Sequence, residues 1–204
     1  GPHPRSRDGN EYILTAVDIF SKWAEAMPIR QHTAVIVAKK LVDNVFSKFG
    51  VPLRILSDQG PEFESALMAE LCRAHGIEKI RTTSYKASTN GTCERFHRTL
   101  NSMLAKVVSE SQRDWDRHVN PVMAAYRATV HRSTGYTPNF LVLGRENRAP
   151  IDLVLAVGGD EPGGIGTSAD EYVHELLDRQ RKAHYLARQH LGEAAQRRKR
   201  EYDV

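Results

Sequence analysis

The sequence predicts an α/β domain followed by a helical arm. Short runs of β-forming residues alternate with runs whose apolar residues recur at helical spacing. A glycine-rich stretch around residue 160 interrupts this pattern, and helical spacing then resumes to the end of the chain. With 204 residues, 40% of them hydrophobic, the chain is long enough for one ordinary domain with a sizeable core and an appendage.

The N-terminal half is predicted to form strands followed by alternating helices and strands. Residues 11–29 are rich in β-formers broken by Ser and Pro, which predicts two or three adjacent antiparallel strands. Helical spacing over residues 33–49 ends at a Gly-Val-Pro sequence. Three further elements are predicted: a strand at 53–58, a helix that ends before His75 and Gly76, and a short strand at 77–83.

A polar segment, residues 84–92, is predicted to be a loop before a helix at about 93–109. In that helix one stripe is apolar and another is polar, so one face is expected to pack while the other stays free for chemistry. The apolar stripe is Phe96, Leu100, Met103 and Val107, and the polar stripe is Glu94, Arg98 and Asn101. A further helix at about 115–130 and a short apolar segment at 133–146 close the compact part.

Residues 149–169 are expected to form a flexible linker because they are rich in glycine. Residues 170–204 then have the pattern of an amphipathic helix or coiled-coil arm, for which we expect few contacts with the core. The arm ends in the basic sequence QRRKRE. A solvated helix end and a DNA contact both fit that sequence.

The amino-acid composition excludes only a few classes of function. The formal net charge of +4 and the pI near 9.1 suit a polyanionic partner without requiring one. Cys72 and Cys93 are isolated, so neither a disulfide framework nor a zinc site is indicated, and a reducing compartment fits best. No apolar run approaches the length of a membrane span.

Two carboxylates are placed where they could form a site. Asp58 ends a predicted strand and Glu94 lies in the first turn of a predicted helix, so both could meet at one edge of the sheet. Carboxylate oxygens are the hard ligands that Mg²⁺ prefers, and paired metals promote phosphodiester chemistry. An aspartate before Gln-Gly-Pro also initiates turns or caps helices, so Asp58 alone does not establish the site.

The surrounding motifs make the pattern specific. The sequences SDQGPEF, TNGTCERFHRTLNSML and AYRATVHRSTGYTPNFLVLGRE, in this order and spacing, resemble the integrase catalytic core of gypsy-type LTR retrotransposons and, more distantly, retroviral integrases. The resemblance covers residues 1–148. It implies a ribonuclease H-like fold, with a mixed sheet flanked by helices. It also implies an enzyme, cut from a Gag-Pol polyprotein, that processes DNA 3′ ends and transfers them to target DNA in the nucleus. The resemblance further implies that this enzyme acts as a multimer and uses Mg²⁺ or Mn²⁺.

The resemblance also assigns residues. Asp58 and Glu94 match the second and third catalytic, metal-binding carboxylates, and the candidate DNA contacts are Lys86, Asn90, Arg95 and Arg98. The family's first catalytic aspartate lies on a strand before the Gly-Pro-x-Pro that begins this sequence. Asp18 instead matches a second-strand aspartate, for which a turn or hydrogen-bonding role is expected. As it stands, the chain is therefore expected to be inactive.

A second hypothesis is a domesticated or decayed integrase that binds DNA or protein without catalysis. The loop before Glu94 reads YKASTNG where the family has approximately YHPQTNG, and this departure motivates the hypothesis. A cut-and-paste transposase on the same fold is disfavoured by the integrase-like motifs after Glu94.

Overall fold

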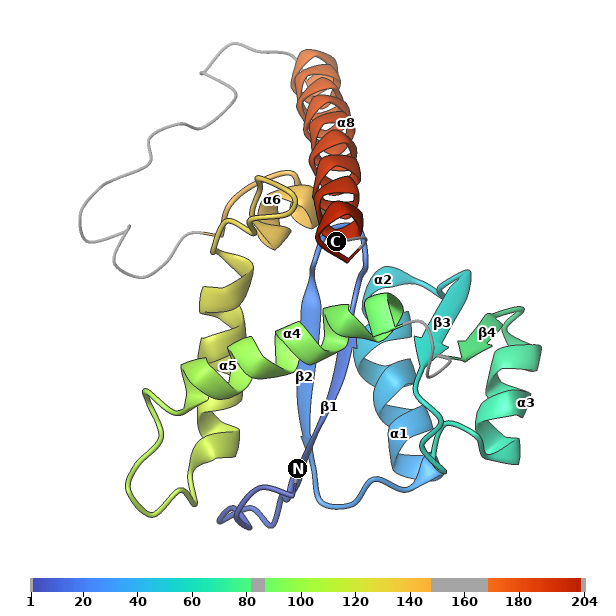
Figure 1. Cartoon of the computed structure of the whole chain (residues 1–204), viewed down its shortest axis with the longest axis vertical. Coiled ribbons are helices and arrows are strands. Elements are labelled where there is room, and N and C mark those ends of the chain that lie inside the picture. The colour runs from blue at the N-terminus through green and yellow to red at the C-terminus, as the bar shows by residue number, and fades with distance from the viewer. Residues whose placement is uncertain (1, 82–86, 148–168, 203–204) are drawn as a thin grey trace. The chain divides into compact units, whose positions relative to one another are not determined.

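The computed structural model describes residues 2–81, 87–147 and 169–202 (Figure 1). The chain divides into two compact units. Unit 1 comprises Gly1–Val17 and Ala24–Ala124, and unit 2 comprises Asp18–Trp23 and Ala125–Val204. The predicted linker lies outside the described residues except for Ala169, its last position.

The strands of unit 1 form two pairs. β1 (Tyr12–Val17) runs antiparallel to β2 (Ala24–Ile29), as expected for residues 11–29. β3 (Arg54–Ser57) runs parallel to β4 (Glu78–Arg81). Both strand orientations of the predicted mixed sheet are therefore present, although among the described residues they form two separate two-stranded sheets.

The helices between these strands also match the predicted pattern. α1 (Ala34–Leu41) begins at Thr33, whose side-chain oxygen accepts a hydrogen bond from the backbone N–H of Ile36. It continues as a π-helical turn, η1 (Val42–Phe46), and as α2 (Ser47–Phe49). Gly50 ends this helix with φ of 81°, and Ser65 caps α3 (Ala66–Ala74) in the same way as Thr33 caps α1.

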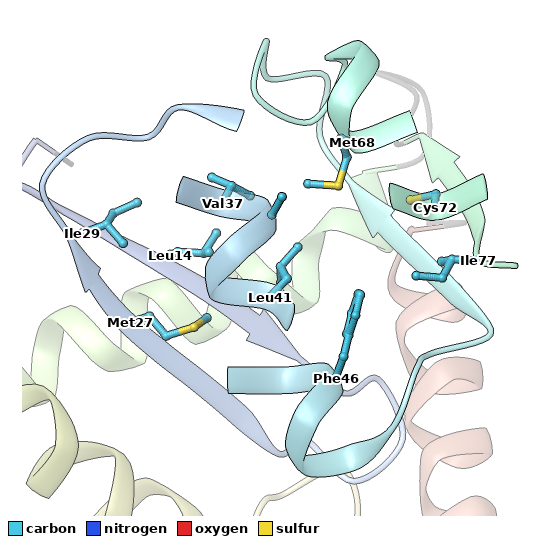
Figure 2. Packing of buried hydrophobic residues seen from close by; sticks show 10 residues of the cluster. Leu14, Met27, Ile29, Val37, Leu41, Phe46, Met68, Cys72 and Ile77 are labelled. Carbon is cyan, nitrogen blue, oxygen red and sulfur yellow. The ribbon is translucent and has the colours of Figure 1, made fainter. Parts of the chain in front are cut away.

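Both strand pairs of unit 1 pack against the same hydrophobic core. Side chains from the β1–β2 hairpin, the helix at 34–49 and α3 point toward one another (Figure 2). The buried members are Leu14, Met27, Ile29, Val37, Ala38, Leu41, Phe46, Met68, Cys72 and Ile77. Half-buried Ile55 of β3 packs against them, so the same core fixes the strand that leads to Asp58.

α4 (Ala87–Leu104) begins earlier than predicted, within the segment expected to be a loop. Gly91, a residue of the predicted loop, is buried inside the helix, and a Cβ there would lie 3.0 Å from Nη1 of Arg95. The glycine thus leaves room for an arginine side chain to fold across the helix. The buried stripe is Phe96, Leu100 and Leu104; Val107 lies beyond the helix end and is 47% exposed, so its predicted packing is wrong.

The segment before β1 is fastened to the start of α5 (Trp115–Arg127). The indole Nε1–H of Trp115 donates to the Pro4 carbonyl oxygen at 2.7 Å. Asp116 Oδ2 accepts hydrogen bonds from Ser6 Oγ at 2.5 Å and from Asn10 Nδ2 at 2.8 Å. These bonds fix the chain where it enters β1.

Unit 2 combines a tight turn, the short helix α6 (Pro138–Leu143) and the long helix α8 (Ala169–Tyr202). The predicted C-terminal helix is confirmed, but the expectation of few contacts is wrong for residues 134–144. Ala183 and Ala187 of α8 are buried in a cluster with Leu141, and His184 Nε2 lies 2.8 Å from the Leu141 carbonyl oxygen. In the described part of the chain, no helix is long and apolar enough to cross a membrane.

Two glycines allow α8 to pack closely on this segment. Gly135 and Gly144 have φ of +75° and +72°. A Cβ on Gly135 would lie 2.7 Å from Nδ1 of His190, and one on Gly144 would lie 2.7 Å from Nε2 of Gln180. Both positions therefore favour glycine for its left-handed backbone and for the space that it leaves.

We expect Gly144→Ala to lower the free energy of unfolding by about 1–2 kcal/mol, because a Cβ strains the left-handed backbone that ends α6. Gly192→Ala is the matched control. Gly192 lies within α8 with nothing near its Cβ position, so alanine there should stabilise by about 0.5–1 kcal/mol. Urea unfolding followed by circular dichroism measures both, and equal effects of the two changes would contradict this account.

Candidate active site

Asp58 lies directly after β3, on an exposed loop that follows the buried Ser57. Its Oδ1 accepts a hydrogen bond from the backbone N–H of Gly60 at 3.2 Å. A Cβ on Gly60 would lie 3.2 Å from this oxygen and 3.1 Å from Oε2 of Glu62. Glycine at position 60 therefore lets two carboxylates face the same small space.

Glu62 is not among the residues that the sequence motifs predict for the site. Its carboxylate is only 16% exposed, and Oε2 lies 3.6 Å from Nδ1 of His32. The signal in the sequence was an acidic residue four positions after Asp58 across a Gly-Pro turn. The structure thus adds a second acidic side chain to the loop that carries Asp58.

Glu94 lies on the solvent-facing side of α4. Glu94, Arg98 and Asn101 are exposed, whereas Phe96 and Leu100 on the other side are buried. The predicted division of this helix into a packed face and a free face is therefore confirmed for these residues. Because α4 packs against β1, the body of unit 1 holds Glu94 in place.

The charges of Asp58 and Glu94 act on the same two side chains of α4. Burial raises the pKa of the Cys93 thiol, and the negative charges of Asp58 and Glu94 raise it further. Burial lowers the pKa of His97, and the same two carboxylates oppose that shift. His97 is also anchored to β1, with Nε2 2.7 Å from Oγ1 of Thr15. The two carboxylates thus lie near one short stretch of α4.

Asp18 has the structural role that was expected. Its Oδ2 accepts hydrogen bonds from the backbone N–H of Ser21 at 2.7 Å and from the Ser21 hydroxyl at 2.6 Å. The carboxylate therefore closes the turn between β1 and β2.

The four candidate DNA contacts are described to different extents. Lys86 lies outside the described residues, and Asn90 is described only as helical backbone. Arg95 and Arg98 are both exposed on α4. Because Arg95 folds back over Gly91, its guanidinium lies on the N-terminal side of Glu94. Arg95 and Arg98 are thus exposed residues of α4 within one turn of Glu94 in the sequence.

The donor set suits a hard cation. Asp58 and Glu94 offer carboxylate oxygens, and no ion pair with Lys or Arg occupies either within the described ranges. Glu62 adds a carboxylate beside Asp58. Among the described residues, however, no group of three or more His, Cys, Asp or Glu side chains is arranged to hold a metal ion. The residues present fit part of a magnesium site.

Residues 3–87 match the family model described as the integrase core domain. The chain is 30% identical over its whole length to the Retrovirus-related Pol polyprotein from transposon 412 of Drosophila melanogaster. It is 39% identical over 137 residues, or 67% of the chain, to the Gag-Pol polyprotein of Baboon endogenous virus (strain M7). The chain spans only 16% and 8% of the lengths of these two curated relatives.

Solved structures give the same likeness. The catalytic core domain of BIV integrase aligns with a TM-score of 0.54 and 28% identity, covering 65% of this chain and 85% of that one. The HTLV-2 integrase catalytic core domain, solved in complex with magnesium, aligns with a TM-score of 0.51 and 21% identity, covering 62% and 80%. These likenesses confirm the predicted ribonuclease H-like fold.

Proposed function

Since the chain belongs to the integrase family of retroviral and retrotransposon Pol polyproteins, we propose that it forms the catalytic core of an enzyme that processes the 3′ ends of element DNA and joins them to target DNA. One observation carries the proposal: Asp58 on the loop after β3 and Glu94 on α4 are exposed carboxylates of the same compact unit, and both lie near Cys93 and His97 of α4. Convergence of carboxylates from separate elements is what metal-dependent phosphoryl transfer requires.

In this proposal each side chain has a distinct role. Mg²⁺ or Mn²⁺, when bound, would activate the attacking hydroxyl and stabilise the leaving oxygen of the phosphodiester. Asp58 and Glu94 would hold the metal, with Asp58 oriented by the Gly60 N–H and Glu94 by the packing of α4. Arg95 and Arg98, together with Lys86 and Asn90, would bind DNA phosphates beside the reacting group.

We assign the third carboxylate to a segment upstream of Gly1. Asp18 does not suit that role because its carboxylate already accepts two hydrogen bonds in a turn. The anchoring of residues 4–10 on α5 would fix the direction from which the upstream segment enters. We also propose that residues 1–148 form the catalytic core, with a linker at 149–169 and an arm at 170–204.

The proposed partners follow from the relatives. HTLV-2 integrase catalytic cores have been solved in trimeric and dimeric forms, and a simian T-cell lymphotropic virus intasome aligns with a TM-score of 0.57. We propose that the parent protein likewise acts as a multimer on retrotransposon DNA ends and target DNA, in the nucleus.

A strand-transfer assay tests the function. The protein extended upstream through the proposed aspartate is incubated with a labelled DNA end and a target duplex. Joined product is expected with Mg²⁺ or Mn²⁺, none with EDTA, and recovery when metal is restored. Duplex binding without joined product in either metal would overturn the proposal and favour the second hypothesis, an integrase-derived protein that binds without catalysis.

A further inference from the structure

Thr15 is a polar residue in the interior of β1 that contacts α4. Side chains of a strand alternate between its two faces, and those of Tyr12, Leu14 and Ala16 pack against the hydrophobic core of unit 1. The side chain of Thr15 therefore points to the opposite face. There its Oγ1 lies 2.7 Å from Nε2 of His97, which is a hydrogen-bond distance. This contact links β1 to α4.

The hydrogen bond adds a directional contact to the packing of α4 on β1. The two elements lie against each other, and the buried residues Phe96 and Leu100 of α4 are apolar. Apolar burial is non-directional, so it restricts small rotations and shifts of a helix only weakly. A hydrogen bond requires a defined distance and angle. The contact between His97 and Thr15 therefore fixes the turn of α4 that ends at His97.

The same turn carries Glu94. Residues three and four positions apart are neighbours on a helix, so Glu94 and Cys93 both lie beside His97. The charge of Asp58, on the loop after β3, also acts on Cys93 and His97. His97 thus lies near both proposed metal ligands, while its ring is held by a strand that carries neither of them.

The protonation state of His97 suits this place. Desolvation lowers the pKa of His97 below its usual value, although the charges of Asp58 and Glu94 oppose the shift. The imidazole is therefore neutral at neutral pH. An uncharged ring holds α4 without adding a positive charge that would repel a divalent cation from the two carboxylates.

We propose that His97 is a positioning residue: through its hydrogen bond to Thr15 it fixes the turn of α4 that carries Glu94, and so holds Glu94 in place relative to Asp58. The role of these carboxylates rests on the proposed function, whereas the contact itself is a property of the fold. Neither Thr15 nor His97 is among the site residues that the sequence motifs predict.

Hydrogen exchange of the chain Gly1–Val204 tests the contact without metal or DNA. Thr15→Val removes the hydroxyl but keeps the shape of the side chain and its preference for a strand. We expect the backbone amides of residues 93–98 to exchange at least fivefold faster, while those of α3 stay within twofold of the parent. His97→Leu should show the same pattern. Thr15→Ser, which keeps the hydroxyl, should exchange as the parent does.

Strand transfer by the protein extended upstream tests the positioning. Thr15→Val and His97→Leu are each expected to lower the rate of joined-product formation at saturating Mg²⁺ by at least tenfold, and Thr15→Ser should stay within threefold of the parent. The matched control is Thr99→Val. Oγ1 of Thr99 donates at 3.0 Å to the Arg95 carbonyl oxygen within α4 itself, so its loss should change neither the rate nor the exchange by more than threefold.

Two kinds of result would overturn the proposal. Faster exchange at residues 93–98 without a fall in strand transfer would mean that the contact holds the helix but does not position Glu94. Unchanged exchange in Thr15→Val, or equal acceleration in α3 and α4, would mean that the contact does not fix this turn. Absence of joined product from the unsubstituted extended protein is a different result. It would contradict the proposed function, while the exchange measurement would still decide whether His97 fixes α4.

Discussion

In the protein extended upstream, Asp58→Asn and Glu94→Gln are each expected to reduce strand transfer by about 10³-fold or more. Each change keeps the size of the side chain and removes the negative charge that would hold a divalent cation. A loss of 10³-fold corresponds to about 4 kcal/mol of transition-state stabilisation, which is of the order that metal-ion catalysis provides. The measurement is the initial rate of joined-product formation in Mg²⁺.

Glu62→Gln is the matched control, since Glu62 shares the loop of Asp58 and its carboxylate faces the same space beside Gly60. If Glu62 only closes the loop through His32, the rate should fall by less than about tenfold. A loss as large as that for Asp58→Asn would make Glu62 a metal ligand. Activity that survives Glu94→Gln would remove Glu94 from the site.

The order of the elements was predictable because their signals are local. The helix at 34–49 combines a threonine cap, helical spacing and a terminal glycine, and each feature acts within a few residues. Asp58 was predictable at a strand end for the same reason, since an apolar run stops where Gly60 permits a turn. Motif spacing then linked Asp58 to Glu94.

Other features depend on contacts that local patterns do not contain. Gly91 was predicted to be a loop residue, yet it is buried inside α4, and the guanidinium of Arg95 lies beside it. The terminal helix was predicted to be a free arm because the glycine-rich sequence before it gives no indication of which residues α8 packs against. Its buried side is formed by small alanines, Ala183 and Ala187, which give a weak apolar signal although they allow close approach to α6. Positive φ at Gly135 and Gly144 completes that contact.

The same reasoning applies to Asp18. By sequence it was the most visible partner for Asp58 and Glu94, because it follows an apolar strand in a conspicuous motif. In the structure, the Asp18 carboxylate accepts hydrogen bonds from Ser21 and closes the turn between β1 and β2. A partner for the site must therefore be sought elsewhere, and this requirement leads to a prediction for the chain as it stands.

The chain Gly1–Val204 alone is expected to form no joined product, whereas the version extended through the upstream aspartate does so. Mg²⁺ requires near-octahedral oxygen coordination, and a pair of such ions needs negative charge between them to offset their repulsion. Asp58 and Glu94 supply two carboxylates, and the described residues contain no cluster of three potential ligands. Two carboxylates are enough to hold one ion weakly but not the pair that strand transfer uses.

The comparison is made at equal protein concentration in Mg²⁺ and in Mn²⁺, with the extended protein carrying Asn at the upstream aspartate as the control. That control should be as inactive as the short chain, but it should match the extended protein in circular dichroism and thermal unfolding. This result would show that activity is lost because a metal ligand is missing, and not because the upstream strand is missing. Equal activity of the short and extended chains would mean that Glu62 or Asp18 supplies the third carboxylate. Glu62→Gln and Asp18→Asn in the short chain would then identify which of them does so, because only the ligand's substitution should abolish the remaining activity.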